Sequence, residues 1–415
     1  MPEIDRPQTH GKKPWLFYGY VVVLAAFVIQ FMMFAPRASF GIYIKPFIAE
    51  FDWSRGLISG AFALSTIIIG FAGIAAGALN DRFGPRVLLT FLGAILGAAY
   101  LLLSVLDAPW QLYVFYSLGV GVGMGGFYVP MLSTVARWFN KRRAVMTGLT
   151  LAGGGIGGIV GPVVLQWISD TEGWRNSFLI MGGTVLVVIV LIAQLLRKDP
   201  ASKGLQPYGT AASVAETDHA AQTVGFTLQE ARRTRQFWMA GFMQFCQGFC
   251  MITMLVHIDP HATDIGISPT DAAVLISVIS GSHVAGGVFL GHVADRIGTR
   301  KVFLISFTLI TVAMLWLFYA REMWMLVIFG VVLGIGGGSG SLNSPMMAEL
   351  FGLRAHGIIL GTSAFATTIG ASLGPLLAGI IFDHTGSYFI AFGICIVLAV
   401  LGFITTTLLR PPRHA

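Results

Sequence analysis

Charged residues are scarce in this chain. Asp, Glu, Lys and Arg make up only 11% of its 415 residues, whereas 55% are hydrophobic. Soluble domains carry about 25% charged residues, so the composition excludes an ordinary soluble protein and predicts an integral membrane protein. Also missing are a metal-ligand cluster, a catalytic triad and a Lys-Ser/Thr ending on any glycine-rich run. We therefore expect neither an enzyme nor an ATP-driven pump, and neither a cofactor nor a bound metal.

Cysteine is rare too, and N-glycosylation sites are absent. Cys246, Cys250 and Cys395 all fall in apolar runs, where a thiol is usually a small packing group, so no disulfide framework is predicted. Every Asn lacks the Asn-x-Ser/Thr context with a permitted middle residue. This favours a bacterial inner-membrane protein.

Twelve apolar segments of roughly 20 residues or more, the length that crosses a bilayer, follow one another. They begin near Trp15, Gly56, Val87, Gln111, Ala144, Ser177, Phe237, Asp271, Val302, Met323, His356 and Tyr388. One long hydrophilic stretch, residues 198–236, separates six segments from six. The sequence predicts an all-α membrane protein of twelve transmembrane helices in two six-helix bundles, residues 1–197 and 237–415, joined by this linker.

Basic residues are distributed unevenly among the loops. Most of the 26 Lys and Arg residues fall in the two tails, the linker and alternate loops. By the positive-inside rule, both termini and the linker are then cytoplasmic. The net charge of +7 is therefore a topology signal, and no nucleic-acid partner is expected.

One ten-residue pattern occurs twice, 214 residues apart. Its first copy starts at Gly77 and contains Asp81-Arg82; its second starts at Gly291 and contains Asp295-Arg296. Parallel repeats of this kind are typical of secondary transporters, with the substrate site between the halves. Both aspartates lie at helix ends, where they can accept hydrogen bonds from arginines or helix N-termini. We predict that Asp81, Arg82, Asp295 and Arg296 form a gate; the alternative is a turn that only orients the chain.

The repeated Gly-x-x-x-Asp-Arg-x-Gly-x-Arg pattern resembles the signature loop of the major facilitator superfamily. Further segments are similar to the monocarboxylate transporters and the oxalate:formate antiporters: Tyr18-Gly19-Tyr20, Phe34-Ala35-Pro36-Arg37, Arg137-Trp138-Phe139, Gly153-Gly154-Gly155 and His257-Ile258-Asp259-Pro260. The resemblance implies a basic residue after the proline of span one, here Arg37. It also implies a substrate-binding arginine in span eight, but that position is Gly287. The aspartate that animal members carry four residues earlier is here His283.

Three ionisable residues are candidates for transport chemistry. Arg37 is suited to binding an anionic group, although it could also extend from the membrane interface towards water. His283 lies midway along span eight and titrates near neutral pH, so it is a candidate for proton coupling and anion binding; a helix–helix contact is the alternative. His257, at the end of span seven, is a weaker candidate for proton coupling.

Polar and aromatic groups in five spans complete the predicted substrate site, since a mostly apolar cavity with a few polar groups suits a small organic solute. They are Tyr116, Phe127, Tyr128, Gln247, Ser280, Asn343 and Thr362. Each of them alone is more often a packing group or part of a hydrogen bond between helices.

Together these features predict a secondary transporter that moves a small organic anion with a proton by alternating access. The family resemblance suggests a monocarboxylate such as lactate or pyruvate, and the protein is expected to act as a monomer in the lipid bilayer. Because Gly287 replaces the arginine, a neutral or cationic solute, or export, stays open. A solute-binding membrane sensor is a remote alternative.

Overall fold

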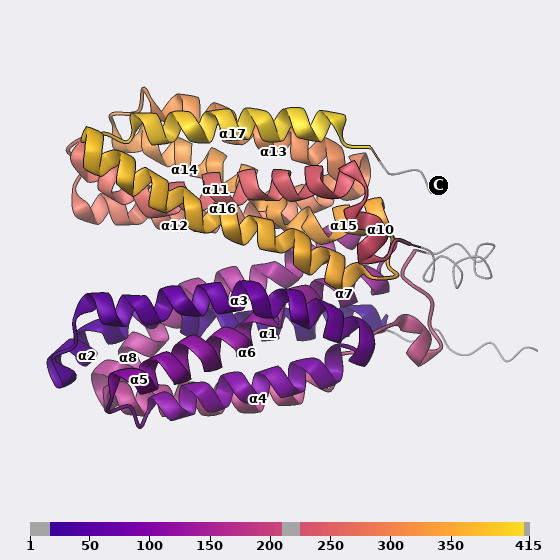
Figure 1. Cartoon of the computed structure of the whole chain (residues 1–415), viewed down its shortest axis with the longest axis horizontal. Coiled ribbons are helices and arrows are strands. Elements are labelled where there is room, and N and C mark those ends of the chain that lie inside the picture. The colour runs from indigo at the N-terminus through magenta and orange to yellow at the C-terminus, as the bar shows by residue number, and fades with distance from the viewer. Residues whose placement is uncertain (1–16, 210–224, 411–415) are drawn as a thin grey trace, which may run out of the picture.

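A computed structural model describes residues 17–209 and 225–410. The described residues form helices joined by short loops, and their only β pairings are the isolated bridges Phe139–Tyr208 and Gly225–Gly352. Figure 1 shows two helical bundles side by side, one from each half of the chain.

The first bundle contains the elements of the N-terminal half. They are α1 (Tyr18–Ala38), η1 (Phe40–Tyr43), α2 (Ile44–Phe51), α3 (Arg55–Phe83), α4 (Pro85–Leu103), α5 (Pro109–Leu112), the π-helix η2 (Tyr113–Val120), α6 (Gly121–Gly125), α7 (Tyr128–Trp138) and α8 (Arg143–Ala193).

The second bundle repeats this layout. After η3 (Pro200–Lys203) and α10 (Leu228–Arg232) come α11 (Arg235–Asp264), α12 (Pro269–Ile297), α13 (Thr299–Leu317), α14 (Met323–Gly337), the 3₁₀ turn η5 (Gly338–Leu342), α15 (Asn343–Phe351), α16 (His356–Thr385) and α17 (Phe389–Leu408).

Twelve membrane crossings are present in the described part of the chain. Eleven helical segments are long and apolar enough to span a bilayer. One of them, α8, is 51 residues long and breaks at Gly173, whose φ of 82° and ψ of 160° are not helical. A glycine tolerates this positive φ without steric cost. α8 thus contains two spans, and the predicted twelve-helix fold is confirmed.

Each bundle has its own buried apolar core, and the lipid-facing surface is also apolar. Tyr100 and Trp138 are fully buried in the first bundle, as are Phe303 and Phe329 in the second. The three cysteines are buried free thiols, as the sequence suggested. Many large side chains on the outside, such as Trp167 and Phe289, are exposed, as expected of helices that face lipid.

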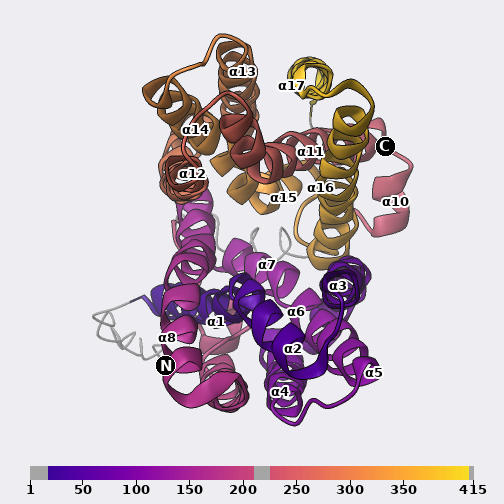
Figure 2. The same cartoon turned by 90° about the vertical axis from the view of Figure 1, so that its left-hand side faces the viewer.

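The bundles meet along two helix pairs, α3 with α16 and α8 with α12 (Figure 2). Glycines make these approaches close. A Cβ added to Gly77 would collide with the carbonyl oxygen of Gly357, and one added to Gly148 would lie 2.6 Å from the carbonyl oxygen of Gly287. Backbone therefore lies against backbone at both contacts, and neither Gly77 nor Gly148 leaves room for a side chain.

Each end of the linker lies on its own bundle. The backbone N–H of Tyr208 donates to the carbonyl of Trp138, and that of Phe226 donates to the carbonyl of Phe351. The short helix α10 opens with a capping box: Thr227 N donates to Glu230 Oε2 (2.7 Å), and Glu230 N donates to Thr227 Oγ1 (3.3 Å). We call this side of the molecule the linker end and the opposite side the far end.

Candidate functional site

Asp81 joins the two bundles at the linker end. It lies in the last turn of α3, where Arg137 Nη2 donates to its Oδ1 at 3.0 Å. Its Oδ2 accepts from the backbone N–H of Ile358, at the start of α16, at 3.3 Å. The partial positive charge of a helix N-terminus favours a carboxylate at this position. One aspartate thus contacts a cation of its own bundle and a helix of the other.

Asp295 makes the equivalent contact in the opposite direction. It lies in the last turn of α12, and its two carboxylate oxygens accept from the backbone N–H groups of Ala144 and Val145, each at 3.0 Å. These N–H groups open α8 in the first bundle. The repeated motif therefore places two carboxylates on two helix N-termini across the same seam.

The arginines that follow these aspartates do not share the contacts. Arg82 is exposed and its guanidinium lies 5.1 Å from the ring centre of Phe83, while Arg296 is exposed with no hydrogen bond or ion pair to any described residue. Successive helical residues point about 100° apart, so a neighbour of the aspartate faces away from the seam. The predicted inclusion of both arginines in the gate is thus not supported by contacts.

Other cations surround Asp81 instead. Arg137 also donates to Asp199 of the linker at 3.5 Å, and Lys198 Nζ donates to the backbone carbonyl of Asp81 at 2.7 Å. The sequence analysis missed these partners, although Arg137 belongs to one of its family-like segments. The positions of Lys198 and Asp199 depend on how the linker folds back onto the first bundle.

Deeper in the first bundle, Arg37 is a charge without a counter-charge. Its Nη2 donates to Thr66 Oγ1 at 2.9 Å, and its guanidinium lies 4.7 Å from the ring centre of Phe62. Nη1 is buried and has no hydrogen-bond partner among the described residues, none of which brings a carboxylate within ion-pair distance.

Two buried phenols accompany Arg37. Tyr116 lies in the π-helix η2, with its ring centre 4.3 Å from that of Phe40, and Tyr100 is fully buried on α4. Arg37 interacts electrostatically with both. Neither hydroxyl has a hydrogen-bond partner within the described ranges, and nor does the amide of Gln30, two turns before Arg37. The sequence analysis missed Tyr100 and Gln30; the only signal was a polar group in an apolar span.

In the second bundle the candidates gather around the break between α14 and α15. Gln247 Nε2 donates to the carbonyl of Gly337 (3.1 Å) and to Ser339 Oγ (2.7 Å). A Cβ added to Gly337 would lie 3.0 Å from Nδ1 of His283, so this imidazole faces the same break. His283 is nevertheless exposed. Gln247 thus holds the backbone, while His283 stays accessible.

Arg37 and His283 lie in opposite bundles, and α8 contacts the helices that carry both of them. A Cβ on Gly161 would lie 2.5 Å from the Cα of Ala35, two residues before Arg37, whereas one on Gly148 would lie 2.6 Å from the carbonyl oxygen of Gly287, one turn after His283. The backbone of Arg37 therefore lies nearer the far end of the molecule than that of His283.

The remaining predicted site residues occupy other environments. The Phe127 ring is fully buried in the core of the first bundle. Tyr128 lies beside Asn343 across the seam. His257 Nε2 is 3.0 Å from the carbonyl oxygen of Pro375, a helix–helix contact. The last two predicted residues carry hydroxyl groups. Thr362 on α16 donates to the carbonyl of Ile358, and Ser280 is half-buried on α12.

Three of these residues make their observed contacts within their own bundle. The Phe127 ring is fully buried in the first core, as is that of Tyr116. His257 packs with its ring centre 5.0 Å from that of Tyr388 and lies within hydrogen-bond distance of the Pro375 carbonyl. Gln247 donates two hydrogen bonds within the second bundle. Their part in a substrate site stays a prediction.

Comparison with known proteins decides the family. The family model described as the Major Facilitator Superfamily matches residues 26–263 and 251–415. The chain belongs to this superfamily. It is therefore a multi-pass membrane transporter of small solutes and not an enzyme.

Curated relatives fall in the two groups that the sequence segments resembled. The oxalate:formate antiporter of Oxalobacter formigenes is 27% identical over 99% of this chain and 97% of its own. Monocarboxylate transporter 13 of Rattus norvegicus is 28% identical over 90% of this chain and 85% of its own.

Solved structures share the fold. The proton:xylose symporter XylE matches with a TM-score of 0.72 at 15% identity, covering 94% of this chain and 95% of its own. The fucose:proton symporter FucP of E. coli matches with a TM-score of 0.70 at 16% identity, covering 95% of this chain and all of its own.

Proposed function

We propose that this transporter moves a small organic anion, with a short monocarboxylate such as lactate or pyruvate as the first candidate. The observation that carries the proposal is Arg37. A charge placed inside a membrane protein is costly unless it is paired. Arg37 has a buried Nη1 with no partner among the described residues, so a carboxylate between the bundles would complete it. The relatives named for monocarboxylates and for oxalate and formate support the same chemistry.

Residues of both bundles would contribute to binding of the solute and the proton. On the first, Arg37 takes the carboxylate as a planar two-donor group, and the Tyr116 hydroxyl donates to a second oxygen of the solute. On the second, His283 would carry the coupled proton, because imidazole gains or loses a proton near neutral pH. Protonated His283 would add a second positive charge to the anion site.

Alternating access would follow from the contacts between the bundles. With the linker end cytoplasmic, as the basic residues favour, the Asp81 and Asp295 contacts close the inner side of the site. Residues 1–197 and 237–415 then rock as two bodies within one monomer. Release of both aspartates from the helix N-termini opens the inner side and lets anion and proton leave.

A neutral solute is the second candidate, and Gly287 favours it. The family's span-eight arginine is missing there, so the second bundle lacks a permanent positive charge at this position. Loss of that arginine is compatible with a weaker anion site built on Arg37, and equally with transport of a solute that is not an anion.

Uptake into proteoliposomes separates these candidates. Uptake of radiolabelled lactate, pyruvate, oxalate, formate and a neutral sugar is measured with and without an inward proton gradient. Exchange is detected in a second set of liposomes that contain unlabelled anion. Arg37→Gln is compared with Lys45→Gln, which removes the same charge from an exposed site. The proposal requires anion uptake that Arg37→Gln abolishes and Lys45→Gln leaves intact. Uptake of only the sugar, unaffected by Arg37→Gln, contradicts it.

A further inference from the structure

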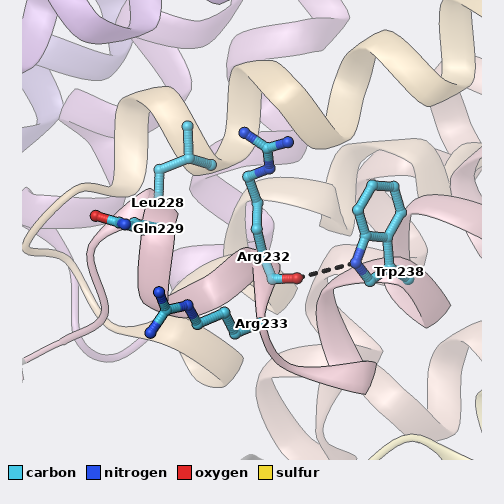
Figure 3. Close-up of a pocket in the computed structure, with 5 residues that line it drawn as sticks. All are labelled: Leu228, Gln229, Arg232, Arg233 and Trp238. Carbon is cyan, nitrogen blue, oxygen red and sulfur yellow. Dashed lines mark hydrogen bonds between the residues drawn. The ribbon is translucent and has the colours of Figure 1, made fainter.

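A basic pocket lies on the surface at the linker end, between α10 and the start of α11. It has a volume of about 600 Å³ and is lined by Leu228, Gln229, Arg232, Arg233 and Trp238 (Figure 3). The Trp238 indole N–H donates to the carbonyl of Arg232 at 3.0 Å. This bond fixes the short helix against the first turn of α11.

Two guanidinium groups give the pocket its charge. Arg232 and Arg233 are both exposed, and neither side chain has a hydrogen bond or ion pair with a residue in the described ranges. Figure 3 shows Arg232 between Leu228 and Trp238, and Arg233 below Gln229. The carboxylate of Glu230 folds back onto the backbone N–H of Thr227, at the other end of α10.

The pocket lies where α11 enters the bilayer. Trp238 is 61% exposed in the first turn of this membrane-spanning helix, and Phe242, one turn further, is 39% exposed on the same side. Exposed apolar side chains on a spanning helix face lipid, and tryptophan concentrates at the level of the headgroups. A basic pocket thus stands directly above an apolar, lipid-facing strip.

We propose that this pocket binds the phosphate headgroup of an anionic phospholipid, whose acyl chains lie along Trp238 and Phe242. Guanidinium groups bind phosphate oxygens through paired charge-assisted hydrogen bonds. Charge and apolar surface are arranged in the same order as in the lipid: phosphate first, then hydrocarbon. A soluble phosphate would use the arginines but not the strip.

The position of α10 links this site to the moving parts. α10 packs against both α11 and α16, and the first turn of α16 receives Asp81. A lipid held here is therefore attached to a helix that takes part in the contact between bundles. The proposal concerns the lipid alone and does not depend on the cargo.

Binding is measured on the full-length protein in phosphatidylcholine nanodiscs or mild detergent, titrated with short-chain phosphatidylglycerol. Thermal stabilisation and native mass spectrometry report the complex. Arg232→Gln/Arg233→Gln is compared with Lys141→Gln/Lys301→Gln, which removes two exposed positive charges elsewhere at the linker end. We expect the affinity for phosphatidylglycerol to fall by about 10- to 30-fold in the arginine variant only. Trp238→Ala should weaken it as well.

Three results overturn the proposal. The first is equal phosphatidylglycerol binding by the arginine variant and the control. The second is equal loss in both double variants, which would mean non-specific attraction by total charge. The third is stabilisation by inorganic phosphate or glycerol phosphate that matches that of the lipid, which would indicate a soluble ligand. Size-exclusion profiles show whether each variant is folded, and uptake assays separate this result from the proposed transport function.

Discussion

The carboxylate of Asp81 accepts a hydrogen bond from the backbone N–H of Ile358, 277 residues further along the chain and in the other bundle. Asp295 makes the reciprocal contact with Ala144 and Val145. The linker end is therefore held by two carboxylates on two helix N-termini. Such contacts are directional and can be broken without disturbing either core.

Neutralising these aspartates should open the linker end. Asp81→Asn and Asp295→Asn each replace a charged acceptor at a helix N-terminus, a loss of about 1–2 kcal/mol, or roughly 5- to 30-fold in population. Electron-resonance distances between spin labels at the exposed positions Phe83 and Ile297 report the change. Arg82→Gln is the control because Arg82 does not reach the seam. A distance distribution unchanged in both aspartate variants would rule out the latch.

The glycine contact at the seam should be equally sensitive to a single methyl group. Gly77→Ala drives a Cβ into the Gly357 carbonyl, and overpacking of this kind costs about 1–3 kcal/mol. The variant should favour the state with the linker end open, measured with the same labels. Gly393→Ala is the matched control, since a Cβ there meets nothing within 4 Å. If Gly77→Ala stays as closed as the control, the helices do not depend on this contact.

Substitution of Gly287 tests whether an arginine at this position would strengthen binding of an anion. A Cβ at this position lies 3.6 Å from the carbonyl oxygen of Gly338, an ordinary contact, so larger side chains can start there. Gly287→Arg would place a guanidinium one turn from His283. For an anionic cargo we expect at least about tenfold tighter binding than in Gly287→Ala, from one charge-assisted pair. Weaker or unchanged binding in a thermal-shift titration would favour a neutral cargo.

Two pseudo-equivalent glutamines should differ in their contribution to stability. Gln244 Nε2 donates to Ser363 Oγ, and its Oε1 accepts from Thr367 Oγ1 at 3.2 Å. Gln30, 214 residues earlier, has no such partner among the described residues. Gln244→Leu should therefore destabilise the protein by about 1–3 kcal/mol and lower Tm. Gln30→Leu should have a smaller effect. An equal or larger fall in the Tm of Gln30→Leu would show that the hydrogen bonds of Gln244 do not account for its contribution to stability.

The sequence was most informative where a local pattern decides the structure. The lengths of the apolar segments predicted the twelve spans. The repeated motif placed Asp81 and Asp295 at helix ends because breaker residues follow both.

Contacts between distant segments could not be read in the same way. The partners of Asp81 are Arg137, Lys198 and Ile358, which come from three separate regions of the chain. The full burial of the Phe127 ring likewise depends on how the helices of the first bundle pack.

Binding of a short carboxylate to the purified protein tests the central claim most directly. Calorimetry at pH 5.5 and 7.5 compares the unchanged protein with Arg37→Gln and Lys45→Gln. We predict a monocarboxylate complex that is lost, or weakened at least about tenfold, in Arg37→Gln alone, since one charge-assisted pair is removed. Equal anion affinity in the unchanged protein and Arg37→Gln would contradict an anion site built on Arg37.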